Sequence, residues 1–395
     1  MGTQAVRCLH LADLHIGWRP KDLGGKEEQR GRERDDLLRK AVDFALDPAN
    51  GIDLVLIAGD LFETHNPRPH LVEEAIRQIG RLRDARVPVV TVPGNHDEIT
   101  YNDSVYKVAA PRWPGVLVTC PQPELVAQVE IKGSPVFIYS LAYTGGVTRT
   151  SPPIRDFPRT GEAGIHIGVF HGSLGWDAGD RSLPIDAEAL GRAGYNYVAL
   201  GHFHGFIGVA QRATQRAPGK VAQTPGKPAV VYCGMVEARG FSDLGTGCFV
   251  VASIRPSEVE IQTIPAGACK CVSVPVDLTG VAGLSELETH LKDVVRQAGP
   301  GALLRISLIG NASFAFDTES LVDGARQDAF YLEVESDAGF LAAAEIDQWA
   351  TEPTIRGEFI RRVRQRLATA TSERDRAILE KALSYGLRAL EGGAS

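Results

Sequence analysis

The sequence has few cysteines, no long apolar run and no excess of basic residues. Its six cysteines are scattered and form no Cys-x-x-Cys pair, which indicates reduced thiols and a cytoplasmic protein. Cys269 and Cys271 are one residue apart, and we expect them to be strand neighbours rather than ligands. Because no run of about eighteen apolar residues is present, we expect no membrane-spanning helix. The first residues lack the charged-then-apolar pattern of a secretory signal, so we expect no export.

The charge balance is acidic, since 42 Lys and Arg residues face 49 Asp and Glu residues, for a formal net charge of −7. A protein that coats nucleic acid through bulk electrostatics is normally basic, so this class is excluded. Any contact with nucleic acid would need local basic patches or bound metal cations. The composition, 44% hydrophobic and 23% charged, is that of a globular protein, and 395 residues are enough for two or three domains.

The pattern of apolar residues divides the chain into three regions. Residues 1–264 alternate short β-branched runs with helical stretches, which is typical of a layered α/β domain. Residues 265–337 predict a smaller α/β module, and residues 338–395 predict a helical tail. We expect strands at 7–11, 53–58, 88–92, 136–140, 165–170, 197–200, 229–233, 247–252, 271–276, 303–308 and 330–335, helices at 34–46, 71–83 and 284–295, and surface loops at 145–164 and 212–228.

Five polar segments stand at or just past the ends of expected strands, where open α/β sheets build their sites. They carry Asp, Asn and His side chains but no thiolate, a donor set that suits Mn, Fe, Zn or Co rather than Ca or a thiolate-type zinc site. Each segment alone is compatible with a turn or a packed histidine, so the interpretation depends on the five together. The segments are Asp13-Leu14-His15, Gly59-Asp60-Leu61-Phe62, Gly94-Asn95-His96-Asp97, His171-Gly172-Ser173 and Gly201-His202-Phe203-His204.

The spacing and number of these donors indicate two ions rather than one. Asp13 and His15 are two residues apart, as are His202 and His204, and an extended backbone points residues i and i+2 the same way. Seven candidate donors exceed what one ion needs if it keeps positions open for water and substrate. Two ions about 3.5–4 Å apart would clamp both oxygens of a phosphoryl displacement. Asp60 follows a glycine that permits close approach, and it is our candidate for a bridging carboxylate.

The order D-x-H, GD-x-F, GNHD, H-G-S and GH-x-H resembles the motif set of the calcineurin-like metallophosphoesterases. The variants here resemble most the DNA repair exonuclease branch, the Mre11 and SbcD proteins. The likeness covers about residues 6–252 and continues into 265–337, which resembles the capping domain of that branch. The tail segments 355–361 and 382–387 look similar to bacterial exonuclease relatives. The resemblance implies a layered α/β/β/α sandwich followed by a small α/β capping module and a helical tail.

The resemblance also implies a dinuclear metal site, with Mn²⁺ as the first choice and Fe²⁺, Zn²⁺, Co²⁺ or Mg²⁺ as alternatives. A water activated by the two ions would attack phosphorus in line. His96 would bind no metal but would protonate the leaving oxygen or stabilise the transition state, and Asp97 would orient its loop. One ion would be held by Asp13, His15 and His204 and the other by Asn95, His171 and His202, with Asp60 bridging the two.

Three further residues are candidates for substrate binding. Trp18 and Arg19 follow the first motif closely and would stack on a base and pair with a phosphate. The alternative is that residues 19–40 form a solvated, charge-balanced loop leading into a helix. Some Mre11 proteins carry a His directly after GD-x-F, where this chain has Glu63, so a phosphate contact from this position is in doubt. His65 is the candidate that would substitute for it.

The partners are also implied by the resemblance. They are single- or double-stranded DNA and a Rad50-like or SbcC-like ATPase, which docks on the segment after the cap in that branch. The apolar stripe of residues 378–390 fits either such docking or packing within the chain. Relatives form homodimers through the phosphoesterase domain, so the helices at 34–46 or 71–83 would serve this purpose here.

Three functions stay open at this point. The first is a metal-dependent DNA exonuclease, with endonuclease activity on single strands, that works in DNA repair. The second is a phosphoesterase on nucleotides, other small phosphate esters or a phosphoprotein, for which the metal site would be nearly the same. The third is a non-catalytic, metal-bound adaptor, and the presence of every expected ligand and of His96 argues against it. The capping module and the tail favour the first, because a small-molecule enzyme needs neither.

Overall fold

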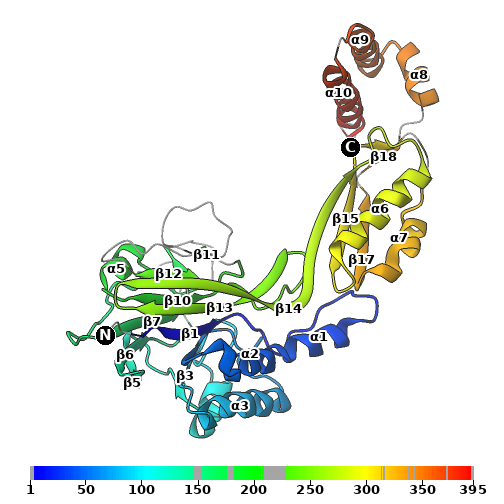
Figure 1. The fold of residues 1–395 in the computed structure, drawn as a ribbon. Helices are drawn as coiled ribbons and strands as arrows, with labels where there is room; N and C mark the ends of the chain where they lie inside the picture. The colour runs from blue at the N-terminus through cyan, green and yellow to red at the C-terminus, as the bar shows by residue number, and fades with distance from the viewer. Residues whose placement is uncertain are drawn as a thin grey trace. The chain divides into compact units, whose positions relative to one another are not determined.

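The chain forms two compact units in the structure, which is a computed structural model (Figure 1). The first unit comprises Met1–Arg239 and Thr246–Ala268, and the second comprises Gly240–Gly245 and Cys269–Ser395. The structure describes residues 4–145, 153–175, 182–205, 207–208, 228–312, 314, 316–336, 338–340, 343–370 and 372–392.

Within the first unit, the first sheet has the strand order β14-β13-β1-β2-β3-β4, and only the first part of β14 (Glu258–Asp277) belongs to this unit. Strands β1 to β4 are parallel. Strand β13 lies next to β1, on the side away from β2, and is antiparallel to it. Each residue of β2 is buried, as expected for a parallel strand that is covered on both faces. The strands are β1 (Val6–Leu11), β2 (Leu54–Ala58), β3 (Val89–Val92), β4 (Val116–Leu117) and β13 (Gly245–Arg255).

The second sheet has the order β11-β12-β10-β7-β6-β5. Its four inner strands are parallel, and the two edge strands β5 and β11 are antiparallel to their neighbours. A two-stranded sheet of β8 and β9 accompanies it. The strands are β5 (Glu124–Ile131), β6 (Ser134–Ser140), β7 (Ile165–His171), β8 (Ser173–Leu174), β9 (Pro184–Ile185), β10 (Tyr197–Gly201), β11 (Ile207–Gly208) and β12 (Ala229–Tyr232).

The two sheets pack face to face, since β2 contacts both β7 and β10. Leu56, Val169 and Ala199 belong to the core that the two sheets share. Helices α2 and α3 pack on the first sheet, and the short helix α5 packs on the other face of the second sheet. The expected α/β/β/α layering is therefore confirmed. The helices of this unit are α1 (Glu27–Asp35), α2 (Leu37–Leu46), α3 (Pro69–Asp84), α4 (Val105–Val108) and α5 (Ala187–Arg192).

The second unit contains a parallel sheet and a set of C-terminal helices. The end of β14 pairs with β15, and β15 pairs with β17, in parallel. Leu287 and Leu291 of α6 pack with Ile306 of β15 in a core of its own. The elements are β14 (Glu258–Asp277), α6 (Leu284–Ala298), β15 (Leu303–Ile309), β16 (Asn311–Ala312), α7 (Thr318–Ala325), β17 (Tyr331–Ser336), β18 (Gly339–Phe340), α8 (Ala343–Thr351), α9 (Ile355–Thr369) and α10 (Glu373–Gly392).

The structure differs from the sequence-based expectations in several places. Strand β14 runs through position 265, next to the boundary expected between the first two regions. The expected helix at 34–46 corresponds to α2, and a separate helix, α1, precedes it within the segment 19–40. Strand β5 was not expected. The greater part of the expected loop at 212–228 lies outside the described residues.

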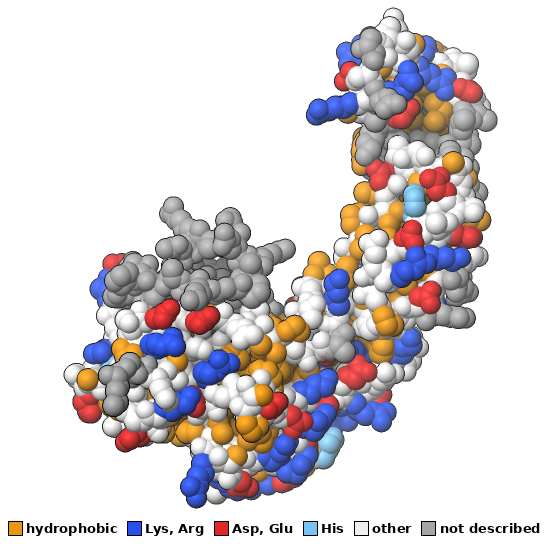
Figure 2. Space-filling model, in the orientation of Figure 1, with side chains coloured by type: hydrophobic (Ala, Val, Ile, Leu, Met, Phe, Trp, Pro, Cys, Tyr) orange, Lys and Arg blue, Asp and Glu red, His pale blue; other side chains and the backbone are white. Residues whose placement is uncertain are grey.

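Basic and acidic side chains are interspersed on the face of the first unit that Figure 2 shows. On α2 and α3, Arg39 and Arg81 both pair with Asp43, at 2.7 and 2.8 Å. On α3, Arg77 pairs with Glu74 at 2.6 Å. These pairs neutralise the basic residues of the two helices, in keeping with the acidic balance of the whole chain.

All six cysteines lie among the described residues, and each is a free thiol. Cys269 and Cys271 both lie in β14, as expected. Within the described part of the chain, no helix has both the length and the apolar character that crossing a membrane requires.

Candidate metal centre

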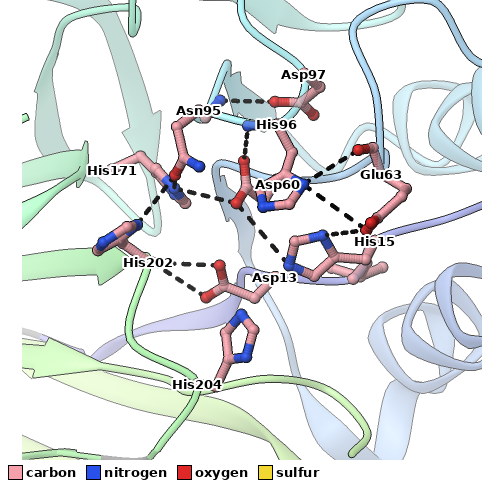
Figure 3. A network of polar contacts seen from close by, with 12 residues as sticks. Asp13, His15, Asp60, Glu63, Asn95, His96, Asp97, His171, His202 and His204 are labelled. Atoms are coloured by element: carbon pink, nitrogen blue, oxygen red, sulfur yellow. Dashed lines mark hydrogen bonds and ion pairs between the residues drawn. The ribbon is translucent and has the colours of Figure 1, made fainter. Parts of the chain in front are cut away.

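The five polar segments come together at the carboxyl ends of five strands of the first unit (Figure 3). Three of these strands, β1 to β3, belong to the first sheet, and two, β7 and β10, belong to the second. Because the sheets pack face to face, their carboxyl-terminal loops meet at one edge. The candidate ligands follow these strands in the order Asp13 and His15, Asp60, Asn95, His171, and His202 and His204.

Four of these candidate ligands adopt a backbone conformation that residues other than glycine rarely take. Their φ angles are 54° at Asp13, 49° at His15, 51° at Asp60 and 107° at His202. Such positive φ values cost of order 1–3 kcal/mol each and cluster at functional sites. The packing of the two sheets therefore holds the ligand loops in strained turns.

Two glycines allow the loops to approach closely. A Cβ at Gly59 would lie 2.1 Å from Nδ1 of His171, and a Cβ at Gly94 would lie 2.2 Å from Oδ1 of Asp60. Neither distance is compatible with a side chain. The glycines of the GD and GN motifs are thus needed because a candidate ligand from another strand occupies the space of their missing side chains.

Asp60 lies at the centre of the cluster. Its Oδ1 accepts a hydrogen bond of 2.8 Å from the backbone N–H of His96, and its Oδ2 lies 3.4 Å from Nε2 of His171 and 3.9 Å from Nε2 of His15. Burial opposes the charged form of Asp60, but the positive charge of neighbouring His171 holds its pKa well below the ordinary value. Asp60 is therefore a buried anion with histidine nitrogens around it.

His171 is fixed on both sides of its ring. Its Nδ1 donates to the carbonyl oxygen of Ala58 at 2.9 Å, which leaves Nε2 facing Oδ1 of Asn95 at 2.9 Å. Burial alone would lower the pKa of His171, but the carboxylates of Asp60 and Asp13 outweigh it and raise the pKa to about 9. The buried carboxylates of Asp60 and Asp13 thus make this pocket attract positive charge.

The side chain of Asn95 contacts both His171 and His202, which come from the second sheet. Its Oδ1 lies 3.0 Å from Nδ1 of His202 as well as 2.9 Å from Nε2 of His171. The backbone N–H of His202 in turn faces the carboxylate of Asp13 at 3.1 and 3.3 Å. One amide oxygen and two imidazole nitrogens thus lie as close to one another as the ligand atoms of one shared cation would.

A second group of donors forms around His15, which is fully buried. Neither of its ring nitrogens has a hydrogen-bond partner among the described residues, although Nδ1 lies 2.9 Å from a carboxylate oxygen of Glu63. Burial lowers the pKa of His15, so the ring is neutral and offers a lone pair. The ligand atoms of Asp13, His15 and His204 lie within 4.8 Å of one another, as do those of Asp13, Asp60 and His171. The orphaned nitrogen and the buried carboxylates fit divalent cations bound by nitrogen and oxygen.

His96 differs from the candidate ligands in its exposure, because 34% of its side chain is accessible. Its Nδ1 lies 3.1 Å from the carbonyl oxygen of Glu63, and its ring contacts that of His15 edge to face with centroids 4.6 Å apart. The structure also brings His96 close enough to His15 and Asp60 to offer an ion a third ligand. Its expected role as a residue that binds no metal stays a prediction.

Asp97 is buried and connects two loops and helix α4. Its Oδ1 accepts from the N–H of Gly94 at 2.7 Å, and its Oδ2 accepts from the N–H of Phe62 at 3.0 Å and from the hydroxyl of Tyr106 at 2.7 Å. Burial, together with the charge of Asp60, raises the pKa of Asp97 to about 6. This geometry is that of a residue which holds the GD-x-F and GNHD loops together.

The three candidates for substrate contact have partners within the protein. One face of the Trp18 ring is covered by the guanidinium of Arg34, at 5.0 Å, and Arg19 pairs with Asp35 at 2.7 Å. His65 stacks on an exposed tyrosine, Tyr101, with ring centroids 4.1 Å apart. The contacts of Trp18 and Arg19 serve the packing of α1, and a role for the three residues in substrate binding stays a prediction.

Two residues beside the cluster were not among the expected site residues. Oε2 of Glu63 lies 2.9 Å from Nδ1 of His15, and Nη1 of Arg239 lies 3.8 Å from the same carboxylate oxygen. Glu63 had a signal in the sequence, since it departs from the His of some Mre11 proteins. Arg239 had none, because it lies in a connection between β12 and β13 that contains no motif.

The motif order and the geometry agree with a sequence comparison. A sequence model of the calcineurin-like phosphoesterase family matches residues 6–206, about half of the chain. The chain therefore belongs to the calcineurin-like phosphoesterase family. It is a metal-dependent phosphoesterase by this membership, as the motif order predicted.

Individual relatives favour the Mre11-like branch of the family. A protein of Bacillus subtilis (strain 168) named uncharacterized metallophosphoesterase YhaO is 24% identical over 312 residues, which are 77% of this chain and 72% of that protein. The DNA double-strand break repair protein Mre11 of Saccharolobus solfataricus is 25% identical over 253 residues, 62% of this chain and 60% of that protein. Mre11 of Methanopyrus kandleri is 24% identical over 296 residues, 73% of this chain and 62% of that protein. The chain thus spans about three fifths of these two Mre11 proteins, and its resemblance to their branch is confirmed.

Proposed function

We propose that the chain hydrolyses phosphodiester bonds of DNA with two divalent ions, as an exonuclease with endonuclease activity on single strands in DNA repair. The observation that carries the proposal is a cluster of seven residues with oxygen and nitrogen donors, one of which is the central, buried Asp60, with His96 partly exposed beside it. Mn²⁺ is our first choice of ion, because the donors are carboxylate, amide and imidazole groups without thiolate. Fe²⁺, Zn²⁺, Co²⁺ and Mg²⁺ are the alternatives.

The donors divide into two ion positions that share one carboxylate. Bound ions would supply Lewis-acid charge to the phosphate and lower the pKa of a water nucleophile. We assign Asp13, His15 and His204 to one position, Asn95, His171 and His202 to the other, and Asp60 to the bridge.

His96 would act on the substrate rather than on the ions. Its exposed ring is held by the carbonyl oxygen of Glu63 and by contact with His15, so an imidazole nitrogen is available to a phosphate oxygen. In this position it would protonate the leaving oxygen or stabilise the transition state. Asp97 would orient the loop through its three accepted hydrogen bonds.

DNA is favoured over a small phosphate ester by the second unit and by the relatives. A small-molecule phosphoesterase needs neither a separate α/β module nor a helical tail. We take residues 1–264 as the nuclease domain, 265–337 as a capping domain and 338–395 as a tail. Several of the relatives that cover most of the first unit are named DNA double-strand break repair proteins. Trp18, Arg19 and His65 are our candidates for DNA contact.

The tail offers a surface for a Rad50-like or SbcC-like ATPase. Leu387 of the apolar stripe is fully buried, whereas the side chains of Ile378 and Tyr385 on the same helix are 54% and 52% exposed. Burying such apolar side chains against a partner would be favourable. The proposal also includes a homodimer formed through α2 or α3 and a location in the cytoplasm.

The test is degradation of 5′- and 3′-labelled single- and double-stranded DNA by the full chain with Mn²⁺. We compare His96→Ala with His70→Ala, a matched control because His70 is an exposed histidine of α3. We expect the DNA cleavage rate to fall about 10²- to 10⁴-fold in His96→Ala and to stay unchanged in His70→Ala. Calorimetry should still count two Mn²⁺ per chain in both variants.

The other two functions are outcomes of the same test. Hydrolysis of bis-p-nitrophenyl phosphate without cleavage of DNA, even with an ATPase partner present, would favour a small phosphate ester as the substrate. Two bound Mn²⁺ without turnover of either substrate would favour the adaptor. Loss of Mn²⁺ from His96→Ala would make His96 a ligand and would contradict its proposed role.

A further inference from the structure

The carboxylate of Glu63 lies beside Nδ1 of His15, the ring nitrogen that is turned away from the proposed ion position. Its Oε2 lies 2.9 Å from Nδ1 of His15, while Nε2 of the same ring points toward Asp60 (Figure 3). His15 is fully buried and the side chain of Glu63 is only 26% exposed. The carboxylate is therefore held against the imidazole in a largely water-free environment, where such a contact is strong.

Arg239 reaches the same carboxylate from a distant part of the sequence. Its Nη1 lies 3.8 Å from Oε2 of Glu63, and its side chain is 23% exposed. Its Nη2 lies 3.4 Å from Nδ1 of His204. The guanidinium balances the charge of Glu63, so that the pair adds a directed contact to the site without adding net charge.

We propose that Glu63 is a positioning residue for the ion site, which fixes the orientation and tautomer of His15, and that Arg239 holds Glu63 in place. With the proton on Nδ1, which lies 2.9 Å from the carboxylate, the lone pair of Nε2 is left for an ion. Carboxylates that accept from the far nitrogen of a histidine ligand act in this way in many metalloproteins, and their loss typically costs 10- to 100-fold in metal affinity. The inference rests on the proposed assignment of His15 as a ligand.

The contact between Glu63 and His15 also gives the residue after GD-x-F a role other than a phosphate contact. Glu63 carries no donor for a phosphate, and its carboxylate is directed at His15 instead. The backbone carbonyl of Glu63 separately holds His96 at 3.1 Å. A substitution of the side chain therefore removes the contact with His15 and leaves the contact that the main chain makes with His96.

The experiment is calorimetric titration of the metal-free full chain with Mn²⁺, which needs no DNA. Glu63→Gln keeps an oxygen that can accept from Nδ1 but loses the charge, and Glu63→Ala loses both. Because His15 belongs to one ion position, one binding event should weaken about 10- to 100-fold in Glu63→Ala and less in Glu63→Gln. Arg239→Gln should weaken the same event, and in the double variant with Glu63→Ala the two effects should be clearly less than additive, because Arg239 acts partly through Glu63 and also contacts His204. Glu74→Ala is the matched control, because Glu74 also pairs with an arginine but on the surface of α3.

Unchanged Mn²⁺ affinity in folded Glu63→Ala would overturn the inference, and so would additive effects of the two residues. Near-ultraviolet and far-ultraviolet circular dichroism of the metal-free variants verifies that they are folded. The result of this titration can be distinguished from a failure of the proposed function. A chain that binds two Mn²⁺ but cleaves no DNA contradicts the proposed substrate alone, whereas a wild-type chain that binds no Mn²⁺ contradicts both.

Discussion

The backbone N–H of His96 donates a hydrogen bond of 2.8 Å to Oδ1 of Asp60. This contact connects the GNHD loop after β3 to the carboxylate after β2, and so it joins the residue we expect to act on the substrate to the residue we expect to bridge the ions. The other oxygen of Asp60 faces His171 and His15. One carboxylate thus fixes the relative positions of both parts of the site.

Asp60→Asn tests the importance of this charge with little change of shape. The amide oxygen can still accept from His96, but the negative charge that attracts cations is lost. We expect the affinity for Mn²⁺ at both positions to fall by at least 100-fold, a larger loss than that caused by residues which contact a ligand but not the ion. Calorimetry of the full chain measures it. Asp84→Asn, at the exposed end of α3, is the control and should bind like the wild type.

Gly94→Ala tests the close approach of the loops. Its new Cβ would lie 2.2 Å from Oδ1 and 2.5 Å from the backbone nitrogen of Asp60, so the loop must move. We expect a loss of about 1–3 kcal/mol in the free energy of unfolding and weaker Mn²⁺ binding. The control is Gly80→Ala within α3, where a Cβ meets no atom within 4 Å. Helix propensity predicts a gain of about 0.5–1 kcal/mol there, and equal effects of the two substitutions in urea denaturation would count against the steric explanation.

The sequence was sufficient to predict that the five polar segments meet, because this depends on local signals. β-branched runs gave the strands, and the polar segments that follow them had to meet where parallel strands end. Residues whose role depends on distant partners could not be found in this way. Arg34 is fully buried because it donates to the carbonyl oxygens of Leu14 and Glu237, and no periodicity marks such a residue. The same applies to Arg239, which reaches Glu63 only through the packing of the two sheets.

The continuity of strand β14 through Pro265 could not be predicted from the sequence either. Pro265 reads as a break because proline has no N–H to give to a strand ladder. In the structure β14 continues through it for twenty residues, from Glu258 to Asp277. A proline on one strand is tolerated where its nitrogen faces no partner, and sequence alone does not reveal which side of a strand is paired.

Tyr106→Phe tests how Asp97 holds the site together. The hydroxyl of Tyr106 is fully buried and donates to Oδ2 of Asp97 at 2.7 Å. A hydrogen bond to a charged group contributes about 1.5–3 kcal/mol, so we expect the free energy of unfolding to fall by this amount. The catalytic rate should fall as well, because the GNHD loop loses one of its anchors. Tyr101→Phe, at a tyrosine that is 45% exposed, should change the stability by less than about 0.5 kcal/mol.

The stability of the chain should depend on pH through His10, which lies in β1 outside the metal cluster. Burial lowers the pKa of His10 to about 3, against 6.5 in the unfolded chain, and its Nδ1 lies 2.9 Å from the hydroxyl of Tyr197. The folded state therefore favours the neutral ring. Its contribution is fully present above pH 6.5 and is lost as the pH falls from 6.5 toward 3, by about 1.4 kcal/mol per pH unit for this one group.

His10→Gln removes this titration, so the difference in unfolding free energy between wild type and variant should shrink as the pH is lowered from 7 to 5. Urea denaturation in a metal-free buffer measures the difference at each pH. His70→Gln on the exposed face of α3 serves as the control, and its difference from the wild type should be independent of pH. A difference for His10→Gln that stays constant over this range would contradict the prediction, because it would mean that His10 gains a proton in the folded chain as readily as in the unfolded one despite its complete burial.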